Sequence, residues 1–462
     1  MCKKMTNFPE KIFFLGAGGI GMSALIRYFL AQNHEVMGYD KTQTKLTQKI
    51  DSEGASIFYE DSVSLVPASF LNPKEVLVVL TPAIPKDSEL LNFFIENNFT
   101  ILKRAQVLGK ITQNAKSIAV SGTHGKTTIS SLIASCLHHN DKAFTAFLGG
   151  ISNNLQSNYY HEVGSEITVV EADEYDKSFL QLFPNCIVVS ALDPDHLDIY
   201  GTEENMITTF QQFTQKNLKE GGAIIAHKSI AHKLETPCFT YALEDTTADY
   251  FVDNIQIVNH NFVADFNGPK VKVTNIAIGL PGIHNLENSL AAFAALHFMG
   301  MDVNEIAAGI KNYKGVERRF DIKLQKNDCI FIDDYAHHPA EITQLVKSVK
   351  ILYPNQKICG VFQPHLFSRT RDFLDGFAEA LELLDELILL DIYPARELPI
   401  PGVTSEVLLN KVNKKLKMLC SKKDVLHHLM ETKSNVVLSI GAGDIGAEVD
   451  KYIEVLQKKW GV

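Results

Sequence analysis

The segment SGTHGKTT, residues 121–128, has the residue types of a loop that binds phosphate groups. The apolar run 118–120 before it predicts a buried strand, and the pattern after it predicts a helix. In that setting backbone amides bind phosphate oxygens, Lys126 reaches the β- and γ-phosphates, and Thr127 binds magnesium. Val120 replaces the first glycine of the usual pattern, so this is a variant phosphate loop.

Polar residues that suit metal-assisted phosphoryl transfer follow two further apolar runs. They are Glu171, Asp173, Glu174, Asp195, His196 and Asp198. Phosphoryl transfer needs a metal ion held by oxygen ligands near the γ-phosphate, and Glu171 at the end of its predicted strand fits that role. His196 could bind a second metal ion or contact substrate. For Asp173, Asp195 and Asp198, a solvated acidic rim or helix caps are an equally good interpretation.

A glycine-rich turn near the amino terminus has the pattern Gly16-x-Gly18-x-x-Gly21, with Gly19 inside it. It lies between an apolar run and a helical pattern, and Asp40 ends the next predicted strand. Such glycines permit a tight turn and let a diphosphate approach the amino terminus of the helix. The pattern alone favours NAD with Asp40 on a ribose. A UDP-sugar, or a packing turn without ligand, fits the same residues.

The middle of the chain offers two further candidate contacts. Asn288 stands ahead of an alanine-rich helical pattern, where it could hydrogen-bond a base edge or act as a cap. Arg319, next to Arg318, could reach phosphates from another domain. A solvated basic pair is the ordinary alternative.

The last third of the chain contains a histidine pair and two arginines that suit a small anionic ligand. His337 and His338 cannot easily share a metal ion, because neighbours on a strand face opposite sides. We therefore expect ligand contacts from this segment, or a helix that starts at Pro339. Arg369 and Arg371 follow another apolar run, and two cations there suit a carboxylate.

These candidate residues follow short apolar runs that recur along the whole chain. The runs do not alternate with polar residues, so they predict strands buried on both faces, and helical patterns lie between several of them. This order predicts an α/β fold with parallel sheets and crossover helices, in which ligands lie beyond the carboxyl ends of the strands. We expect three domains, at residues 1–115, 116–320 and 321–462.

The composition excludes several classes of protein. Apolar residues make up 45% of the 462 residues and charged residues 21%, as in an ordinary globular protein. The net charge of −10 argues against a general binder of nucleic acid or anionic membranes. The 7 cysteines form no C-x-x-C pair and predict reduced thiols in a cytoplasmic protein. Four glycines interrupt the apolar run 12–26, which argues against a secretory signal.

The combination of motifs resembles the Mur ligases over nearly the whole chain. In order, the matching segments are GAGGIGMSAL, SGTHGKTT, EADE, DHLD, HNLENSLAA, RRF, DDYAHHP, QPHLFSRTRDF, DIYPARE and GAGD. The resemblance implies a Rossmann-like amino-terminal domain for a UDP-sugar, a central ATPase domain and a Rossmann-like carboxyl-terminal domain for an amino acid. It further implies ATP-dependent amide formation with magnesium, in which L-alanine is joined to the lactyl carboxylate of UDP-N-acetylmuramate during peptidoglycan precursor synthesis.

Carried over by position, the resemblance assigns roles to residues already singled out. The implied catalytic residues are Lys126, Glu171, His196 and Arg319, and the implied metal ligands are Thr127, Glu171 and His196. Those expected at ATP are Gly122, Thr123, His124, Gly125, Lys126, Thr127, Thr128, Asn288 at adenine and Asp334 at the ribose. Those expected at the UDP-sugar are Gly16, Gly18, Gly19, Gly21, Asp40 and His124. His337, Arg369 and Arg371 are expected near the alanine. No obligate protein partner is implied.

Some residues depart from the pattern of the L-alanine-adding members. Tyr175 stands where serine is common, and EADEY is also the spelling of the related ligases that attach a recycled tripeptide to the same UDP-sugar. The segments QPHLFSRTRDF and DIYPARELPIPGVTS favour alanine addition, and tripeptide addition is the alternative. Ala336 replaces a common glycine, and residues 197–215 contain no lysine that could be carbamylated. A nicotinamide dehydrogenase would explain the glycine turn alone and leaves the phosphate loop and EADE unused. A nucleotide-regulated scaffold would need a phosphate loop without turnover.

Overall fold

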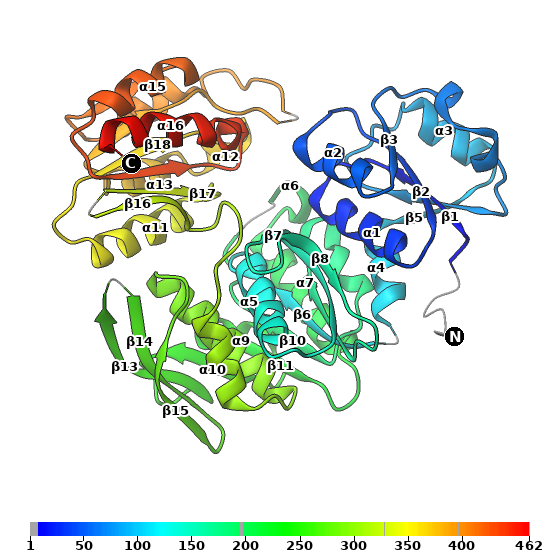
Figure 1. Cartoon of the computed structure of the whole chain (residues 1–462), viewed down its shortest axis with the longest axis horizontal. Helices are drawn as coiled ribbons and strands as arrows, with labels where there is room; N and C mark the ends of the chain where they lie inside the picture. The colour runs from blue at the N-terminus through cyan, green and yellow to red at the C-terminus, as the bar shows by residue number, and fades with distance from the viewer. Residues whose placement is uncertain are drawn as a thin grey trace. The chain divides into compact units, whose positions relative to one another are not determined.

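The computed structural model describes residues 8–113, 115–194, 197–259, 261–327, 329–395 and 397–461. They form three mainly parallel sheets that lie between helices (Figure 1), which confirms the predicted α/β class. The sheets fall within residues 11–103, 116–277 and 321–440. The chain divides into two compact units, the first mainly up to Asn254 and the second mainly from Gly315 onward. The boundaries 1–115, 116–320 and 321–462 stay a prediction.

The first sheet has the strand order β3-β2-β1-β4-β5, and its pairs are parallel. Its strands are β1 (Lys11–Leu15), β2 (Glu35–Tyr39), β3 (Ser56–Phe58), β4 (Val76–Leu80) and β5 (Thr100–Lys103). Its helices are α1 (Ile20–Ala31), α2 (Lys45–Ser52), α3 (Glu89–Glu96) and α4 (Arg104–Thr112). Successive residues of β1 belong to different cores: Phe14 packs with α1, and Phe13 with α3. Burial on both faces explains the uninterrupted apolar run.

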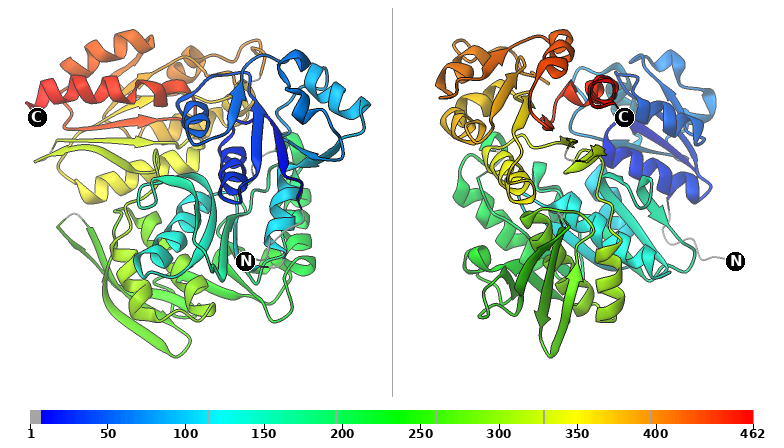
Figure 2. Two further views of the ribbon diagram at one scale, coloured as in Figure 1. Left: turned by 45° about the vertical axis from the view of Figure 1, so that its right-hand side comes forward. Right: turned by 60° about the vertical axis from the view of Figure 1, so that its left-hand side comes forward.

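The second sheet has ten strands, in the order β15-β14-β13-β12-β11-β10-β6-β9-β7-β8. The strands of its parallel part are β6 (Lys116–Ser121), β7 (Phe144–Ser152), β9 (Ile167–Glu171), β10 (Cys186–Val189), β11 (Ala223–His227) and β12 (Phe239–Leu243). The edge strand β8 (Ser157–His161) pairs antiparallel to β7. The polar stretch near 245–280 forms β13 (Tyr250–Val258), β14 (Asn261–Gly268) and β15 (Val271–Ala277), the long green strands in Figure 2.

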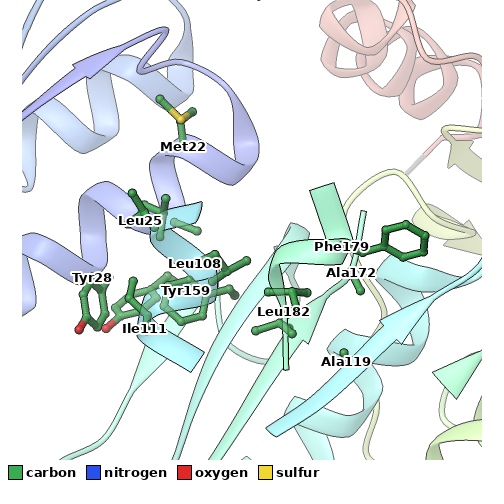
Figure 3. Close-up of a cluster of buried hydrophobic side chains, with 14 of the residues drawn as sticks. Met22, Leu25, Tyr28, Leu108, Ile111, Ala119, Tyr159, Ala172, Phe179 and Leu182 are labelled. Carbon is green, nitrogen blue, oxygen red and sulfur yellow. The ribbon is translucent and has the colours of Figure 1, made fainter. Parts of the chain in front are cut away.

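The helices that follow these strands are α5 (Lys126–His139), α6 (Leu197–Tyr200), α7 (Glu203–Lys216), α8 (Lys228–Ala231), α9 (Ile283–Phe298) and α10 (Val303–Lys311). One apolar core joins the first sheet's helices to the second sheet. Leu25 of α1 and Leu108 of α4 belong to it together with Tyr159 of β8 and Leu182 (Figure 3). Burial of such side chains contributes roughly 1.5–3 kcal/mol each.

The third sheet has the order β16-β17-β21-β18-β19-β20. Its strands are β16 (Asp321–Lys326), β17 (Cys329–Asp334), β18 (Ile358–Phe362), β19 (Glu386–Leu389), β20 (Lys417–Leu419) and β21 (Val436–Ile440). Its helices are α11 (Pro339–Leu352), α12 (Phe367–Asp372), α13 (Leu374–Leu381), α14 (Ser405–Lys411), α15 (Lys422–Glu431) and α16 (Val449–Trp460). Helices α15 and α16 pack on one face of this sheet (Figure 1), and its strand β16 pairs antiparallel to β17. Within the described ranges, no helix combines the length and the apolar character needed to span a bilayer.

Candidate active site

The phosphate loop connects the end of β6 to the start of α5. Gly122 and Gly125 have φ values of +122° and +81°, which side chains rarely adopt. The loop is held by hydrogen bonds from the Thr123 backbone N–H to the Ala191 carbonyl oxygen, 3.0 Å, and from the Ser190 hydroxyl to the Ser121 carbonyl oxygen, 3.1 Å. The first backbone N–H groups of α5 therefore occupy a fixed position at a helix amino terminus, as a phosphate site requires.

Lys126 is the first residue of α5, and its ammonium group lies over the loop. Nζ donates hydrogen bonds to the Gly122 carbonyl oxygen at 2.7 Å and to Glu174 Oε1 at 2.8 Å. The Glu174 side chain is only 1% exposed. Burial alone would lower the pKa of Lys126, but the carboxylates of Glu174, Glu171 and Asp173 raise it above its usual value. The ammonium group is therefore charged at neutral pH, as binding to a polyphosphate requires.

The end of β9 and the segment after it give each of three carboxylates a different partner. Glu171 accepts a hydrogen bond from the Gly149 backbone N–H, 3.1 Å from Oε2, and Asp173 accepts one from Arg104 Nη2 at 3.3 Å. Glu174 pairs with Lys126. Because β6 and β9 are parallel neighbours with Val120 opposite Glu171, the phosphate loop and these carboxylates lie at the same edge of the sheet.

Gly149 is needed where it approaches the Glu171 carboxylate. A Cβ atom at Gly149 would lie 2.2 Å from Glu171 Oε1, closer than real Cβ atoms come. The absence of a side chain thus lets the backbone N–H of β7 orient the carboxylate that the sequence assigned to a metal ion.

A cavity of about 170 Å³ extends from the glycine turn to the carboxylates of Glu171 and Asp173. Its lining residues include Gly19, Gly21, Thr81, Arg104, Leu108, Phe147, Gly149, Glu171 and Asp173. Arg104 contributes the cation, and it packs so closely on the turn that a Cβ at Gly21 would lie 2.9 Å from its Nη1. The sequence elements predicted to bind a diphosphate and to hold a metal ion thus border one cavity.

The glycine turn is fixed by β2 and by Asp40. The Tyr39 carbonyl oxygen accepts hydrogen bonds from the backbone N–H groups of Gly16 and Ala17, at 2.8 and 2.9 Å. Asp40 Oδ2 accepts one from the Gly18 N–H at 2.7 Å. Asp40 therefore holds the turn itself in this structure, and its predicted contact with a ribose stays a prediction.

Other predicted residues lie close to the phosphate loop. A Cβ at Gly125 would be 2.9 Å from Asn288 Oδ1, so α9 brings Asn288 beside the loop. His124 Nε2 lies 3.3 Å from Asp193 Oδ2. Thr127 and Thr128 are largely buried in the first turn of α5. His196 and Asp195 lie outside the described residues, as does the side chain of Asp198.

The described oxygen donors suit magnesium. Among the residues that the structure describes, no group of three or more His, Cys, Asp or Glu residues is placed to hold a metal ion. Mg²⁺ commonly binds to one or two protein oxygens and takes its other ligands from water and substrate phosphates. The Glu171 carboxylate, which lines the cavity, and the Thr127 hydroxyl match that donor chemistry.

The second unit contains a cluster around Tyr335, where the sequence allowed a solvated basic pair. Arg318 and Arg319 both lie over the Tyr335 ring, 5.1 and 4.9 Å from its centroid, and Arg318 Nε is 3.3 Å from Asp333 Oδ2. Asp334 accepts hydrogen bonds from the Phe320 and Ala336 N–H groups at 2.6 and 2.8 Å. Burial raises the pKa of Asp334 to about 6, although Arg319 acts in the opposite direction.

His337 and Arg369 lie in one cluster, and Arg371 forms an ion pair with Asp372. The ring centroid of His337 is 6.0 Å from that of His365, whose Nδ1 lies 3.5 Å from Arg369 Nη1. Arg371 Nε is 2.7 Å from Asp372 Oδ1, and about half of the Arg371 side chain is exposed. His338 caps α11, which begins at Pro339 as predicted, so the two histidines have separate roles.

Burial lowers the pKa of His337 to about 4, with Arg369 and Arg319 adding to the effect and Glu341 opposing it. A histidine whose folded pKa lies below the unfolded value of 6.5 stabilises the fold above pH 6.5, and that stability is lost as the pH falls toward 4. We expect the loss of unfolding free energy between pH 7 and 5 to be smaller by about 2 kcal/mol in His337→Gln than in the unmodified protein. Urea denaturation at both pH values measures it. Equal losses in the two proteins would contradict this assignment.

Three residues at the site had no role assigned from the sequence. Glu174 ends the acidic segment EADE, and nothing local in the sequence indicates that it pairs with Lys126. Arg104 and Gly149 lie far along the chain from Asp173 and Glu171, and no motif links them. The sequence offers one indication for Arg104, which is its position at the start of a helix that directly follows β5.

Comparison with known proteins identifies the same family in three segments. Residues 11–116 match the family model described as Mur ligase family, catalytic domain, and residues 120–296 match the Mur ligase middle domain. Residues 318–443 match the model described as Mur ligase, glutamate ligase domain.

Individual relatives cover nearly the whole chain. The chain is 45% identical to the UDP-N-acetylmuramate–L-alanine ligase of Parabacteroides distasonis over 98% of each chain. It is 44% identical to the enzyme of that name from Phocaeicola vulgatus, over 98% of this chain and 99% of the relative. A crystal structure of UDP-N-acetylmuramate-alanine ligase from Thermotoga maritima has a TM-score of 0.81 and 27% identity, covering 97% of this chain and 99% of the other. A murein peptide ligase from Psychrobacter arcticus shares the fold, with a TM-score of 0.69 and 22% identity over 96% and 98% of the two chains.

Proposed function

The chain belongs to the Mur ligase family, and on that premise we propose that it joins L-alanine to the lactyl carboxylate of UDP-N-acetylmuramate in a reaction driven by ATP. Relatives whose names state this activity are 42–45% identical to the chain over 98% of its length. The structural observation that carries the proposal is the cavity that leads from the glycine turn to Glu171, at the same sheet edge as the phosphate loop.

The proposed chemistry has two steps. A carboxylate is a poor acyl donor because its oxygen is a poor leaving group. The lactyl carboxylate therefore attacks the γ-phosphorus of ATP, which releases ADP and forms an acyl phosphate. The amino group of L-alanine then attacks the carbonyl carbon and loses a proton, and inorganic phosphate leaves as the bond between that carbon and the phosphate oxygen breaks.

The residues of the first unit supply what this first step needs. The glycine turn and Arg104 would bind the diphosphate at one end of the cavity, which directs the rest of the UDP-sugar toward the carboxylates after β9. Lys126 and the amino terminus of α5 would bind the β- and γ-phosphates of ATP. Thr127 and Glu171 would hold a magnesium ion, which supplies positive charge where two anions must meet. The contact of Asn288 with adenine and the role of His196 stay predictions.

The second unit offers a site for the amino acid. Arg369 is a cation that suits the carboxylate of L-alanine. His337, whose pKa is about 4, carries no charge at neutral pH and can accept a hydrogen bond from the amine. Arg371 at the carboxylate, Asp334 at the ribose and Arg319 at the phosphates are proposed from the family pattern. Apart from its substrates, no obligate protein partner is proposed.

The reaction is proposed to take place in the cytoplasm. The described cysteines, Cys136, Cys186, Cys238, Cys329, Cys359 and Cys420, are free thiols, as expected in a reducing compartment.

The test is ADP release from ATP and magnesium with UDP-N-acetylmuramate, measured with L-alanine, with the L-Ala-D-Glu-diaminopimelate tripeptide and with neither. We expect release to depend on L-alanine and to yield a product heavier by one alanyl residue. Preference for the tripeptide would instead assign the protein to precursor recycling, and Tyr175 would then be the first residue to exchange. No ADP release with either acceptor would overturn the proposal.

A further inference from the structure

We propose that Glu174 is a positioning residue that holds Lys126 in the orientation needed to bind the β- and γ-phosphates. This inference rests on the proposed use of ATP and deepens it. It assigns to Glu174 a role separate from that of Glu171, three residues earlier in the same segment. It concerns a side chain that touches the lysine and not the substrate.

The first argument is the geometry of the ammonium group. A lysine ammonium has three N–H donors. One is directed to the Gly122 carbonyl oxygen at 2.7 Å and a second to Glu174 Oε1 at 2.8 Å. With Nζ fixed by two acceptors from different segments, the direction of the third donor is fixed as well. A lysine side chain otherwise has four rotatable bonds and loses considerable entropy when it is ordered by a ligand.

The second argument is burial, which makes the pair persist when nucleotide binds. The Glu174 side chain is 1% exposed, and that of Lys126 is 15% exposed. If Lys126 left Glu174 for a phosphate, the buried carboxylate would lose this ion pair at 2.8 Å, and breaking a buried ion pair is strongly unfavourable. The lower-energy arrangement keeps the pair and uses the remaining N–H donor for the phosphate. In this arrangement the ammonium group of Lys126 would lie between the negative charge of Glu174 and the phosphates.

The third argument is that the backbone around Glu174 is itself held. The Tyr200 hydroxyl donates a hydrogen bond of 2.6 Å to the Glu174 carbonyl oxygen, and Tyr200 is buried. Asp176 and Lys177 follow with φ values of +52° and +54°, which non-glycine residues rarely adopt. Such conformations persist only where the surrounding structure determines them, so the carboxylate is presented to Lys126 from a fixed position.

Glu174→Gln tests the inference, because it keeps the size of the side chain and removes its charge. Two dissociation constants are measured for the full-length protein without the other substrates, one for magnesium ATP and one for AMP. We expect ATP binding to weaken about tenfold. The dissociation constant for AMP should remain unchanged, because AMP lacks the β- and γ-phosphates that Lys126 is proposed to bind. Glu174→Asp, which keeps the charge but shortens its reach, should lie between Glu174→Gln and the unmodified protein.

Glu166→Gln is the matched control, since Glu166 is exposed and immediately precedes β9. It should bind ATP like the unmodified protein. Unchanged or tighter ATP binding in folded Glu174→Gln would overturn the inference, and so would an equal loss for ATP and AMP, which would indicate general damage to the site. If Glu174→Gln does not fold, Glu174→Asp tests the inference in the same way, by comparing its loss of ATP binding with its loss of AMP binding. Failure of the proposed function is distinguishable, because the unmodified protein would then release no ADP with L-alanine.

Discussion

Lys126→Ala is expected to lower the rate of L-alanine-dependent ADP release by about a thousandfold, because it removes the charged donor proposed for the β- and γ-phosphates. The structure adds a second effect. Removal of Lys126 leaves the Glu174 carboxylate buried without the ammonium group at 2.8 Å, so we expect the free energy of unfolding to fall by roughly 3–5 kcal/mol. Initial rates at saturating substrates and chemical denaturation measure the two effects separately.

The double variant Lys126→Ala/Glu174→Gln separates activity from stability. It removes the buried negative charge of Glu174 as well as the lysine, so much of the lost stability should return while ADP release stays about a thousandfold slower. Lys216→Ala, at an exposed position at the end of α7, is the control for loss of a lysine and should be active. Near-normal ADP release by folded Lys126→Ala would contradict the assignment of the phosphate loop.

The predictable part of the site is the part in which local sequence determines geometry. The loop glycines, Lys126 and Thr127 are contiguous, and a strand before them and a helix after them are sufficient to place them. Glu171 could be assigned because parallel strands bring their carboxyl ends to one edge. The α/β class followed from apolar runs that are buried on both faces, and the structure confirms it.

The remaining part depends on tertiary packing that no local pattern encodes. Arg104 meets Asp173 only because α1 and α4 share a core with the second sheet (Figure 3). Gly149 is recognisable as necessary only when its distance to the Glu171 carboxylate is known. Both relationships join residues that are distant along the chain, so they become visible only in the folded protein.

Glu171→Gln is expected to have the second large effect, with kcat about a hundredfold to a thousandfold lower and the magnesium concentration for half-maximal rate raised about tenfold. Glutamine matches the shape of glutamate, and its side-chain oxygen can still accept the hydrogen bond that the Gly149 N–H donates at 3.1 Å. The substitution removes the negative charge while keeping the orientation, so folding should be little affected. The measurement is ADP release over a range of magnesium concentrations at fixed ATP.

The control for Glu171→Gln is again Glu166→Gln, at the opposite end of β9, which should retain the magnesium dependence of the unmodified protein. The pair of glutamates at the active site gives a sharper comparison. Glu174→Gln should act mainly on ATP binding through Lys126, whereas Glu171→Gln should act mainly on kcat and on the magnesium requirement. If the two variants had the same profile, the separate roles would be wrong. If Glu171→Gln kept a normal magnesium dependence, the metal ligand would have to be sought among other residues of the site.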